Sequence, residues 1–418
     1  MSHQNPLTVI VPISKDMLVN LRNVLQEINQ ELIAQKHVDF ENLGTIHYCR
    51  WIILEEADTN GQHYFPQLAF SSNFDGELDK HITDLASGSV ALLMDRIYEC
   101  CEGYPAVSSR NTDQRIIYFK KWMVKPMAFY RGAPGRSITQ IKQESILRNH
   151  LRNILNSRNW QNVSAKQVHQ EFKKSSAMNP EFDWAKTSVP LPKLNWPGLI
   201  LLGLILLILL PVIIIWVLIV HFFYERHDVP LGLSPSQIDE KHMLELEEYE
   251  DLQFQNQFTQ VLEMKPGRVR LITVKAFMLL ATGLIRFLFI ENNLMGIPTI
   301  HFARWLMIDN NKRMLFLSNF DGSWQQYLGD FIDKSGWGLT AIWSNTVGFP
   351  KTNFLVTGGA YDAEHFLAWS RYYEIKTQIW YSAYPHLSIK NIVNNSHIRV
   401  DVMKDLDEDQ AQQFLKRF

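Results

Sequence analysis

The chain has little cysteine and almost no net charge, and each shortage excludes a class of protein. Its 418 residues include three cysteines, too few for a disulfide scaffold or a cysteine-rich zinc site. Unpaired thiols suit a reducing compartment. The formal net charge of -2 lacks the basic excess of nucleic-acid-binding domains, so no nucleic-acid partner is expected. The hydrophobic content of 46% excludes a disordered chain and suits two or three domains.

Familiar signals of targeting and catalysis are also missing from the sequence. The first residues, MSHQNPLTVIVPISKD, lack a basic region followed by an apolar run, so no secretory signal is predicted. The sequence contains no P-loop, G-x-G-x-x-G, H-E-x-x-H, G-x-S-x-G or C-x-x-C motif. Chemistry therefore has to be inferred from residues outside these motifs.

A long apolar run is the strongest feature that is present. Residues 196–220, WPGLILLGLILLILLPVIIIWVLIV, contain no charged side chain. Helices in soluble cores seldom stay apolar on every face over this length, so a membrane segment is predicted at residues 196–224, with the lipid bilayer as partner. Pro211 near its middle leaves two alternatives: a re-entrant hairpin, which we favour, and a kinked span.

The flanks of this run differ in charge. Residues 136–195 carry ten Lys and Arg against four Asp and Glu, whereas residues 225–255 carry two against nine. The positive-inside rule therefore places the region before the run on the cytoplasmic side. A single span would leave the second half of the chain on the opposite side.

The two halves of the chain repeat one another. GTIHYCRWIIL at residues 44–54 matches PTIHFARWLMI at 298–308, and FSSNFDG at 70–76 matches FLSNFDG at 316–322. EGYP and VGFP follow in the same order. Each copy reads as β-α-β-β-α-β, with fourth strands expected at residues 128–131 and 353–357.

The predicted fold class is α+β, with two ferredoxin-like repeats that pair as an α+β barrel around an inserted membrane segment. Pairing needs both repeats on one side of the membrane, which favours the hairpin. Residues 269–290 could instead form a second span, or a helix in the bilayer surface, and the barrel could form between two chains of a homo-oligomer. The expected divisions are repeat 1 at residues 1–156, a basic linker at 157–195, the membrane segment at 196–224, an acidic linker or helix at 225–256, and repeat 2 with a C-terminal extension at 257–418.

Each repeated strand holds a histidine and an arginine among apolar residues: His47 and Arg50, and His301 and Arg304. Because side chains alternate along a strand, His and Arg cannot both enter one cavity unless a bulge intervenes. One interpretation makes one of them a haem ligand, a general base or an oxyanion donor. The alternative is a buried His bonded to the SNFDG loop and an Arg paired with a carboxylate.

The SNFDG segments place an acid at the end of a strand and before a helix. Asp75 and Asp321 could cap that helix, or could handle protons at the barrel mouth. Asn73 and Asn319 could order the same turn, and with His47 and His301 they are the candidate cofactor-binding residues.

These SNFDG segments resemble the G-x-x-D-G motif of dye-decolorizing peroxidases, a distant relation within the dimeric α+β barrel superfamily. The resemblance implies a haem pocket with Asp75 or Asp321 as the distal acid, Arg50 or Arg304 as its partner, and a histidine of the second half as the proximal ligand. Ser72 and Ser318 stand in place of the first glycine of the motif. Taken whole, with TIHFARW, SNFDG and GFP, the chain is similar to a group of bacterial membrane-associated proteins, which implies fold more than function.

Two functions follow as hypotheses. The first is a membrane-anchored α+β barrel that binds an apolar cofactor or lipid-like substrate, with haem-dependent peroxidase-type oxidation as its sharpest version. The second is a membrane-bound binding or scaffold module without enzymatic activity, in which the repeated polar residues maintain the fold. The soluble parts are expected on the cytoplasmic side. A transporter is disfavoured because one or two apolar segments are too few.

Overall fold

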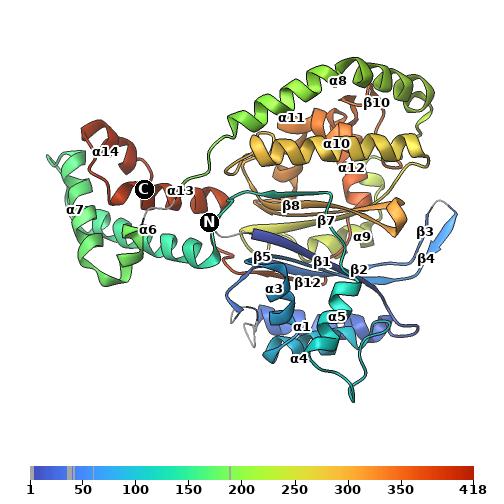
Figure 1. Ribbon diagram of the computed structural model, residues 1–418, viewed down its shortest axis with the longest axis horizontal. Coiled ribbons are helices and arrows are strands. Elements are labelled where there is room, and N and C mark those ends of the chain that lie inside the picture. Colours follow the sequence, from blue (N-terminus) through green and yellow to red (C-terminus); the bar gives the residue numbers. More distant parts are fainter. Residues whose placement is uncertain (1–3, 35–39, 41–42, 60, 188–189) are drawn as a thin grey trace.

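Two antiparallel four-stranded sheets lie at the centre of the protein (Figure 1). The computed structural model describes residues 4–34, 40, 43–59, 61–187 and 190–418. The first sheet has the strand order β1-β5-β2-β12 and the second has the order β6-β8-β9-β7. The strands are β1 (Gln4–Pro12), β2 (Ile46–Leu54), β3 (Ala57–Thr59), β4 (Gln62–Tyr64), β5 (Gln67–Asp75), β6 (Ala128–Arg131), β7 (Gln255–Glu263), β8 (Ile300–Ile308), β9 (Arg313–Asp321), β10 (Thr352–Asn353), β11 (Thr357–Gly358) and β12 (Ile379–Ser382).

Helices cover the outer side of each sheet and form an arm at one end (Figure 1). Helices α1, α3, α4 and α5 lie below the first sheet, α10, α11 and α12 lie above the second, and α6, α7, α13 and α14 make the arm. The bounds are α1 (Leu18–Ile33), α3 (Leu78–Leu85), α4 (Gly88–Tyr98), α5 (Thr112–Lys121), α6 (Ile138–Ser157), α7 (Ala165–Met178), α8 (Trp196–Phe223), α9 (Glu240–Glu247), α10 (Arg268–Phe287), α11 (Trp324–Trp343), α12 (Ala363–Tyr373), α13 (Ile389–Val402) and α14 (Glu408–Leu415).

Each half of the chain gives one strand to the sheet of the other half. Strand β6 pairs with β8, and β12 pairs with β2, so the fourth strand of each half lies beside the second strand of its counterpart. The fold is mixed α/β, but two self-contained ferredoxin-like repeats are not confirmed, because neither half completes a sheet alone. Within the described residues the sheets do not close into a barrel. Isolated bridges, Val9 to Met123 and Gln260 to Glu374, lie where each exchanged segment passes its own first strand.

The fourth strand of the second half lies later in the chain than the sequence suggested. Residues 352–358 form the short β10–β11 hairpin, and the strand is β12. Its counterpart β6 is at the predicted residues 128–131. The aromatic segment around β12 thus matches the segment around β6. A shared Pro-x-x-Ser-Ile pattern, at residues 134–138 and 385–389, marks the correspondence.

The strands alternate between two apolar layers. Trp51 and Ile53 of β2 pack toward the helices of the first half, whereas Ile52 and Leu54 join Leu306 of β8 between the sheets. Strands buried on both faces lose the apolar-polar alternation that one-sided sheets show. This packing explains why β2 and β8 are apolar almost throughout.

Helix α8 runs unbroken through Pro211. The favoured re-entrant hairpin needs a turn near this proline, and the structure has none there. The two halves of the chain exchange strands and therefore form one body. Helix α8 thus does not separate the first half from the second, as a single membrane span would. Helix α10 packs on the second sheet through Val274 and Met278, as the first helix of its repeat and not as a separate span. The basic linker at residues 157–195 contains the helix α7.

Candidate functional site

A β-bulge stands at each repeated histidine. The pairing of β2 with β5 shifts register between Ile46 and Tyr48, and that of β8 with β9 shifts between Ile300 and Phe302. The extra residue in each strand is the histidine. A bulge breaks the strict alternation of a strand, so His47 and His301 join the layer between the sheets together with the residues that follow them.

Each histidine contacts the aspartate of its own SNFDG segment. His47 Nε2 lies 3.1 Å from Asp75 Oδ1, and His301 Nε2 lies 2.7 Å from Asp321 Oδ1. His47 and His301 are at most 1% exposed. The expected contact between a buried His and the SNFDG loop is therefore present in both halves.

The same aspartates hold the start of a distant helix. Asp75 Oδ2 accepts the backbone N–H of Ile138 at 2.8 Å, and Asp321 Oδ2 accepts that of Ile389 at 2.8 Å. These residues begin α6 and α13, the helices after the exchanged strands. The carboxylates do not cap the helices next in sequence, where Glu77 and Ser323 hold the N-cap positions. A carboxylate at a helix N-terminus stabilises the helix through its free N–H groups and its dipole.

An aromatic cluster separates the two His–Asp pairs. Tyr384 Oη lies 2.8 Å from His47 Nδ1, and the ring of Phe302 lies 5.3 Å from the His47 ring. Tyr48 meets the His301 ring edge-on at 5.5 Å. Burial raises the pKa of Tyr48 and of Tyr384 well above the usual value, so both phenols stay neutral.

Neither tyrosine was among the candidate residues predicted from the sequence. Where the first half has Tyr48 the second has Phe302, and Tyr384 corresponds to Ala133. The cluster therefore breaks the symmetry of the repeat. The Pro-x-x-Ser-Ile pattern was the available signal, because it aligns Tyr384 with the end of β6.

The two arginines cross from one half to the other. Arg50 Nη1 donates to Phe258 O and Thr259 Oγ1, each at 3.0 Å, and its Nη2 donates to Ser318 O at 2.7 Å and to Asn319 Oδ1. All four acceptors belong to β7 and β9 of the second half. The Arg50 side chain therefore joins the first sheet to the second.

Arg304 makes the equivalent contacts in the opposite direction. It donates to Leu7 O at 2.8 Å, Thr8 Oγ1 at 3.0 Å, Ser72 O at 2.8 Å and Asn73 Oδ1. Asn73 and Asn319 thus accept from these arginines and do not order the turn as expected. No carboxylate of the described residues pairs with either guanidinium, so the expected Arg–carboxylate pair is replaced by neutral oxygens.

Burial of these uncompensated cations is costly. Both arginines are 2% exposed. Burial lowers the pKa of Arg50 to about 9 and that of Arg304 to about 9, the latter helped by the charge of Arg50. Their hydrogen bonds to buried oxygens offset this cost. The arrangement suits a clasp between halves, because each guanidinium is already occupied by protein acceptors.

The eight candidate side chains do not surround an open cavity. All except Asp75 are almost fully buried, and the imidazoles are enclosed by aspartate, tyrosine and phenylalanine. An axial haem ligand needs an imidazole nitrogen facing a cavity. The residues as arranged do not fit a haem. Nor do the described residues include a group of three or more His, Cys, Asp and Glu side chains that could hold a metal ion.

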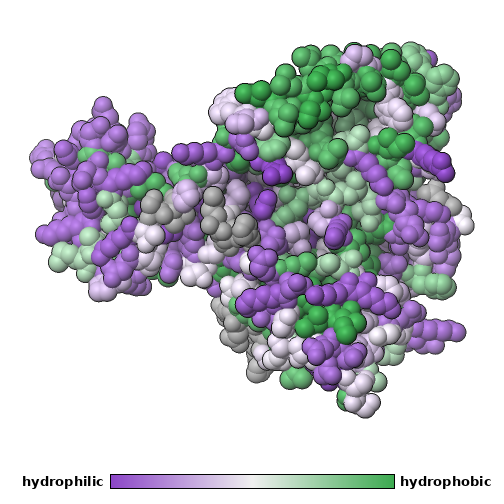
Figure 2. Space-filling view, viewed as in Figure 1, coloured by the Kyte–Doolittle hydropathy of each residue, from purple (hydrophilic) through white to green (hydrophobic). Residues whose placement is uncertain are grey.

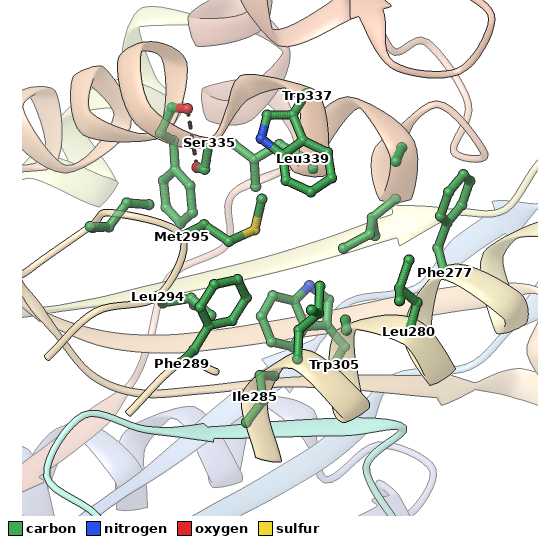
Figure 3. A pocket seen from close by; sticks show the side chains of 17 residues that line it. Phe277, Leu280, Ile285, Phe289, Leu294, Met295, Trp305, Ser335, Trp337 and Leu339 are labelled. Carbon is green, nitrogen blue, oxygen red and sulfur yellow. Dashed lines mark hydrogen bonds between the residues drawn. The ribbon is translucent and has the colours of Figure 1, made fainter. Parts of the chain in front are cut away.

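The second candidate region is a pocket between α10 and α11 (Figure 3). Its volume is about 50 Å³. Apart from Ser335 it is lined by apolar side chains and glycine, among them Phe277, Leu280, Ile285, Phe289, Met295, Trp305, Trp337 and Leu339. The hydroxyl of Ser335 donates to Phe331 O at 3.2 Å, so it offers little to a polar ligand. No motif in the sequence signalled this pocket, because it joins residues of two helices, a loop and strand β8.

Helix α8 packs against α10 on the surface of the molecule next to this pocket. It is the one helix of the described chain that is long and apolar enough to cross a membrane. Most of its leucine and isoleucine side chains are exposed, and Figure 2 shows the hydrophobic surface that they form along the upper edge of the molecule. Soluble monomers rarely expose a continuous apolar surface of this extent.

No protein family, curated protein or solved structure matches this chain. The likeness to dye-decolorizing peroxidases therefore stays a prediction from the SNFDG segments.

Proposed function

We propose that the protein is a monotopic membrane protein, which attaches to one face of a bilayer through α8 and binds a lipid-like molecule there. The observation that carries the proposal is the position of α8. This helix of 28 residues contains no Asp, Glu, Lys or Arg, is exposed along most of its length, and has both ends attached to the same body. Such a surface is stable only when something apolar covers it.

The first end of α8 is attached to the end of α10. The N–H of Asn195 donates to Phe287 O at 3.3 Å. Gly198 packs so closely on the ring of Phe287 that a Cβ at this position would come within 2.6 Å of it. Farther along, Trp216 Nε1 donates to Thr273 Oγ1 at 3.0 Å. The helices therefore run antiparallel, side by side.

The second end of α8 is attached to the β10–β11 hairpin. His221 Nδ1 lies 2.6 Å from a carboxylate oxygen of Glu225, and the His221 ring stacks on Phe354 at 4.0 Å. Glu225 also accepts the N–H of Leu355 at 2.9 Å and the hydroxyl of Thr352. A span would carry the two ends of α8 to opposite sides of the bilayer and would break one of these attachments. An in-plane position keeps both.

The apolar side chains of α8 supply the attachment energy. Complete burial of one leucine or isoleucine contributes roughly 1.5–3 kcal/mol, so a few of the exposed ones suffice for stable binding. Unlike most interfacial helices, α8 has no polar face of its own. The remainder of the folded body, whose surface away from α8 is largely hydrophilic (Figure 2), keeps the protein at the bilayer surface. That the protein lies on the cytoplasmic side of the membrane remains a prediction, which rests on the charges of the residues that flank α8.

Flotation with phospholipid vesicles tests the attachment. The double variant Ile208→Arg/Ile215→Arg changes exposed positions of α8 and places two charges in the apolar surface that contacts the bilayer, where burying an unpaired charge is unfavourable. We expect wild type to float and this variant to sediment. Val107→Arg/Ile117→Arg is the matched control, because these exposed side chains lie in α5 and the segment before it, across both sheets from α8 (Figure 1), and should not affect flotation. If the α8 variant floats like wild type, the proposed attachment is wrong.

Protease treatment of sealed vesicles tests the in-plane position. Both halves should be cut from the same side. Protection of residues 257–418 while residues 1–156 are digested would instead support a span and overturn the monotopic arrangement.

The packing of the repeated polar residues favours a binding module over an enzyme. Haem-dependent oxidation rests on the resemblance alone, and its test is an absorption spectrum after haem supplementation. A Soret band that disappears in His47→Ala or His301→Ala, with the variant still folded, would reverse this preference.

A further inference from the structure

We infer that the α10–α11 pocket is a slot for the end of one acyl chain of a bilayer phospholipid. This inference rests on the proposed membrane attachment and names the lipid-like ligand and its site. It is carried by three observations: the apolar lining, the position of the pocket beside α8, and the basic character of α10.

The lining favours a hydrocarbon over water or a polar ligand. Ser335 is the polar side chain of the pocket, and its hydroxyl is bonded within α11. Water in a buried site needs two to four polar partners, which this pocket does not offer. Its volume of about 50 Å³ accommodates roughly four water-sized groups, which corresponds to a few carbons at a chain end. The slot therefore takes the tip of a chain and leaves the remainder in the bilayer.

The pocket adjoins the surface that would face lipid. Phe277, Leu280 and Leu284 of α10 line it, while Gly283 of the same helix packs on Leu202 of α8. A chain lying beside α8 therefore needs to pass only α10 to reach the pocket. At the α11 side stands Trp337, which is 47% exposed; tryptophan is favoured at the boundary between hydrocarbon and headgroups.

The charge of α10 favours a phospholipid. Its twenty residues include no acidic residue and four basic ones, Arg268, Arg270, Lys275 and Arg286, of which Arg270 is buried and paired with Asp228. Lys275 and Arg286 are exposed, and Arg286 follows directly on Ile285 of the pocket. The exposed cations Lys275 and Arg286 would attract the phosphates of lipids that gather at this surface, which favours a phospholipid over a neutral lipid.

The shape of the pocket depends on a close approach of α11 to the loop after α10. A Cβ added at Gly338 would come within 1.9 Å of the Met295 methyl group. A larger residue at Gly338 would push α11 away from this loop. Substitutions intended to fill the pocket are therefore better placed on α10. Ala281 lines it between Phe277 and Ile285, and Ala281→Phe would place a ring inside it. Leu279→Phe is the matched control, because Leu279 is 76% exposed on the outer face of the same helix.

Photocrosslinking tests the slot. The full-length protein is bound to vesicles that contain phosphatidylglycerol with a diazirine at the end of one acyl chain, and labelled peptides are identified by mass spectrometry. We expect labelling of α8 and also of pocket residues such as Phe289, Met295 and Trp337. Ala281→Phe should reduce the pocket labelling about tenfold, equivalent to losing one or two buried methylenes, and should leave the α8 labelling unchanged. Leu279→Phe should match wild type.

The outcomes separate this inference from the proposed function. Labelled α8 with an unlabelled pocket in wild type would overturn the slot and leave the attachment intact. Absence of both would overturn the attachment as well. If a free fatty acid with the same diazirine labels the pocket and the phospholipid does not, the assignment to a phospholipid is wrong. The wild-type labelling decides the matter even if Ala281→Phe fails to fold, and Leu284→Phe, on the same helix, provides a second way to fill the pocket.

Discussion

The side chain of Arg50 donates to the amide oxygen of Asn319, 269 residues away in the other half of the chain. Arg304 and Asn73 repeat this contact with the halves reversed. The duplicated sequence therefore encodes a reciprocal clasp, in which a cation from each second strand crosses to the opposite sheet.

Loss of either arginine should destabilise the whole protein. Arg50→Ala or Arg304→Ala would leave several buried oxygens without a donor, at an expected cost of about 3 kcal/mol in the free energy of unfolding. Urea unfolding measures this cost. Arg152→Ala, at an exposed position of α6, is the control and should be neutral. Wild-type stability of both clasp variants would show that the contacts contribute nothing.

Loss of an aspartate should loosen a helix that is remote in sequence. Asp321→Ala removes the acceptor for Ile389 N–H and should speed hydrogen exchange in the first turn of α13 about tenfold, the effect of losing about 1.4 kcal/mol. Asp75→Ala should do the same at Ile138 in α6. Each variant serves as the control for the other. Equal acceleration of both helices in one variant would contradict local capping.

His81 should make the first half sensitive to acid. Burial, with a smaller effect of Lys80, lowers its pKa to about 3, while an unfolded histidine titrates near 6.5. Between about pH 6.5 and 3 the unfolded chain takes up a proton that the folded chain does not, so stability should fall by up to about 1.4 kcal/mol per pH unit. Melting curves across this range measure the effect.

The second half offers a matched replacement for His81. His81 stacks on Phe74 at 3.8 Å and lies 2.9 Å from Ser72 Oγ; Tyr327 stacks on Phe320 at 3.9 Å and donates to Ser318 Oγ at 2.8 Å. His81→Tyr should therefore fold and lose this part of the acid sensitivity. An unchanged pH profile would show that His81 is not the group responsible.

Lys265 should make the stability of the protein depend on pH in the alkaline range. Burial lowers its pKa to about 8 although Asp228 lies 2.7 Å away. The folded state releases a proton near pH 8 and the unfolded state near 10.4, so stability should rise with pH between these values. Lys265→Met should abolish this rise in urea unfolding, while Arg270 still pairs with Asp228. A persistent rise would assign it to another group.

The sequence by itself determined the local elements and the duplication. The TIH and SNFDG segments predicted β2, β5, β8 and β9, and the uncharged run predicted α8, because apolar periodicity and length depend on neighbouring residues alone. The contact between His47 and the SNFDG loop was also among the alternatives, since a buried polar group needs a nearby partner.

Only the tertiary structure decided which partners these elements take. A four-residue strand such as β12 has too little pattern to specify its neighbour, so its pairing with β2 depended on how the two halves pack. The same packing directs Asp321 to α13 rather than to the helix that follows it, and Arg50 to Asn319 instead of a carboxylate. The unbroken course of α8 and the pocket beside it likewise arise from contacts between segments far apart in the chain, which no local pattern contains.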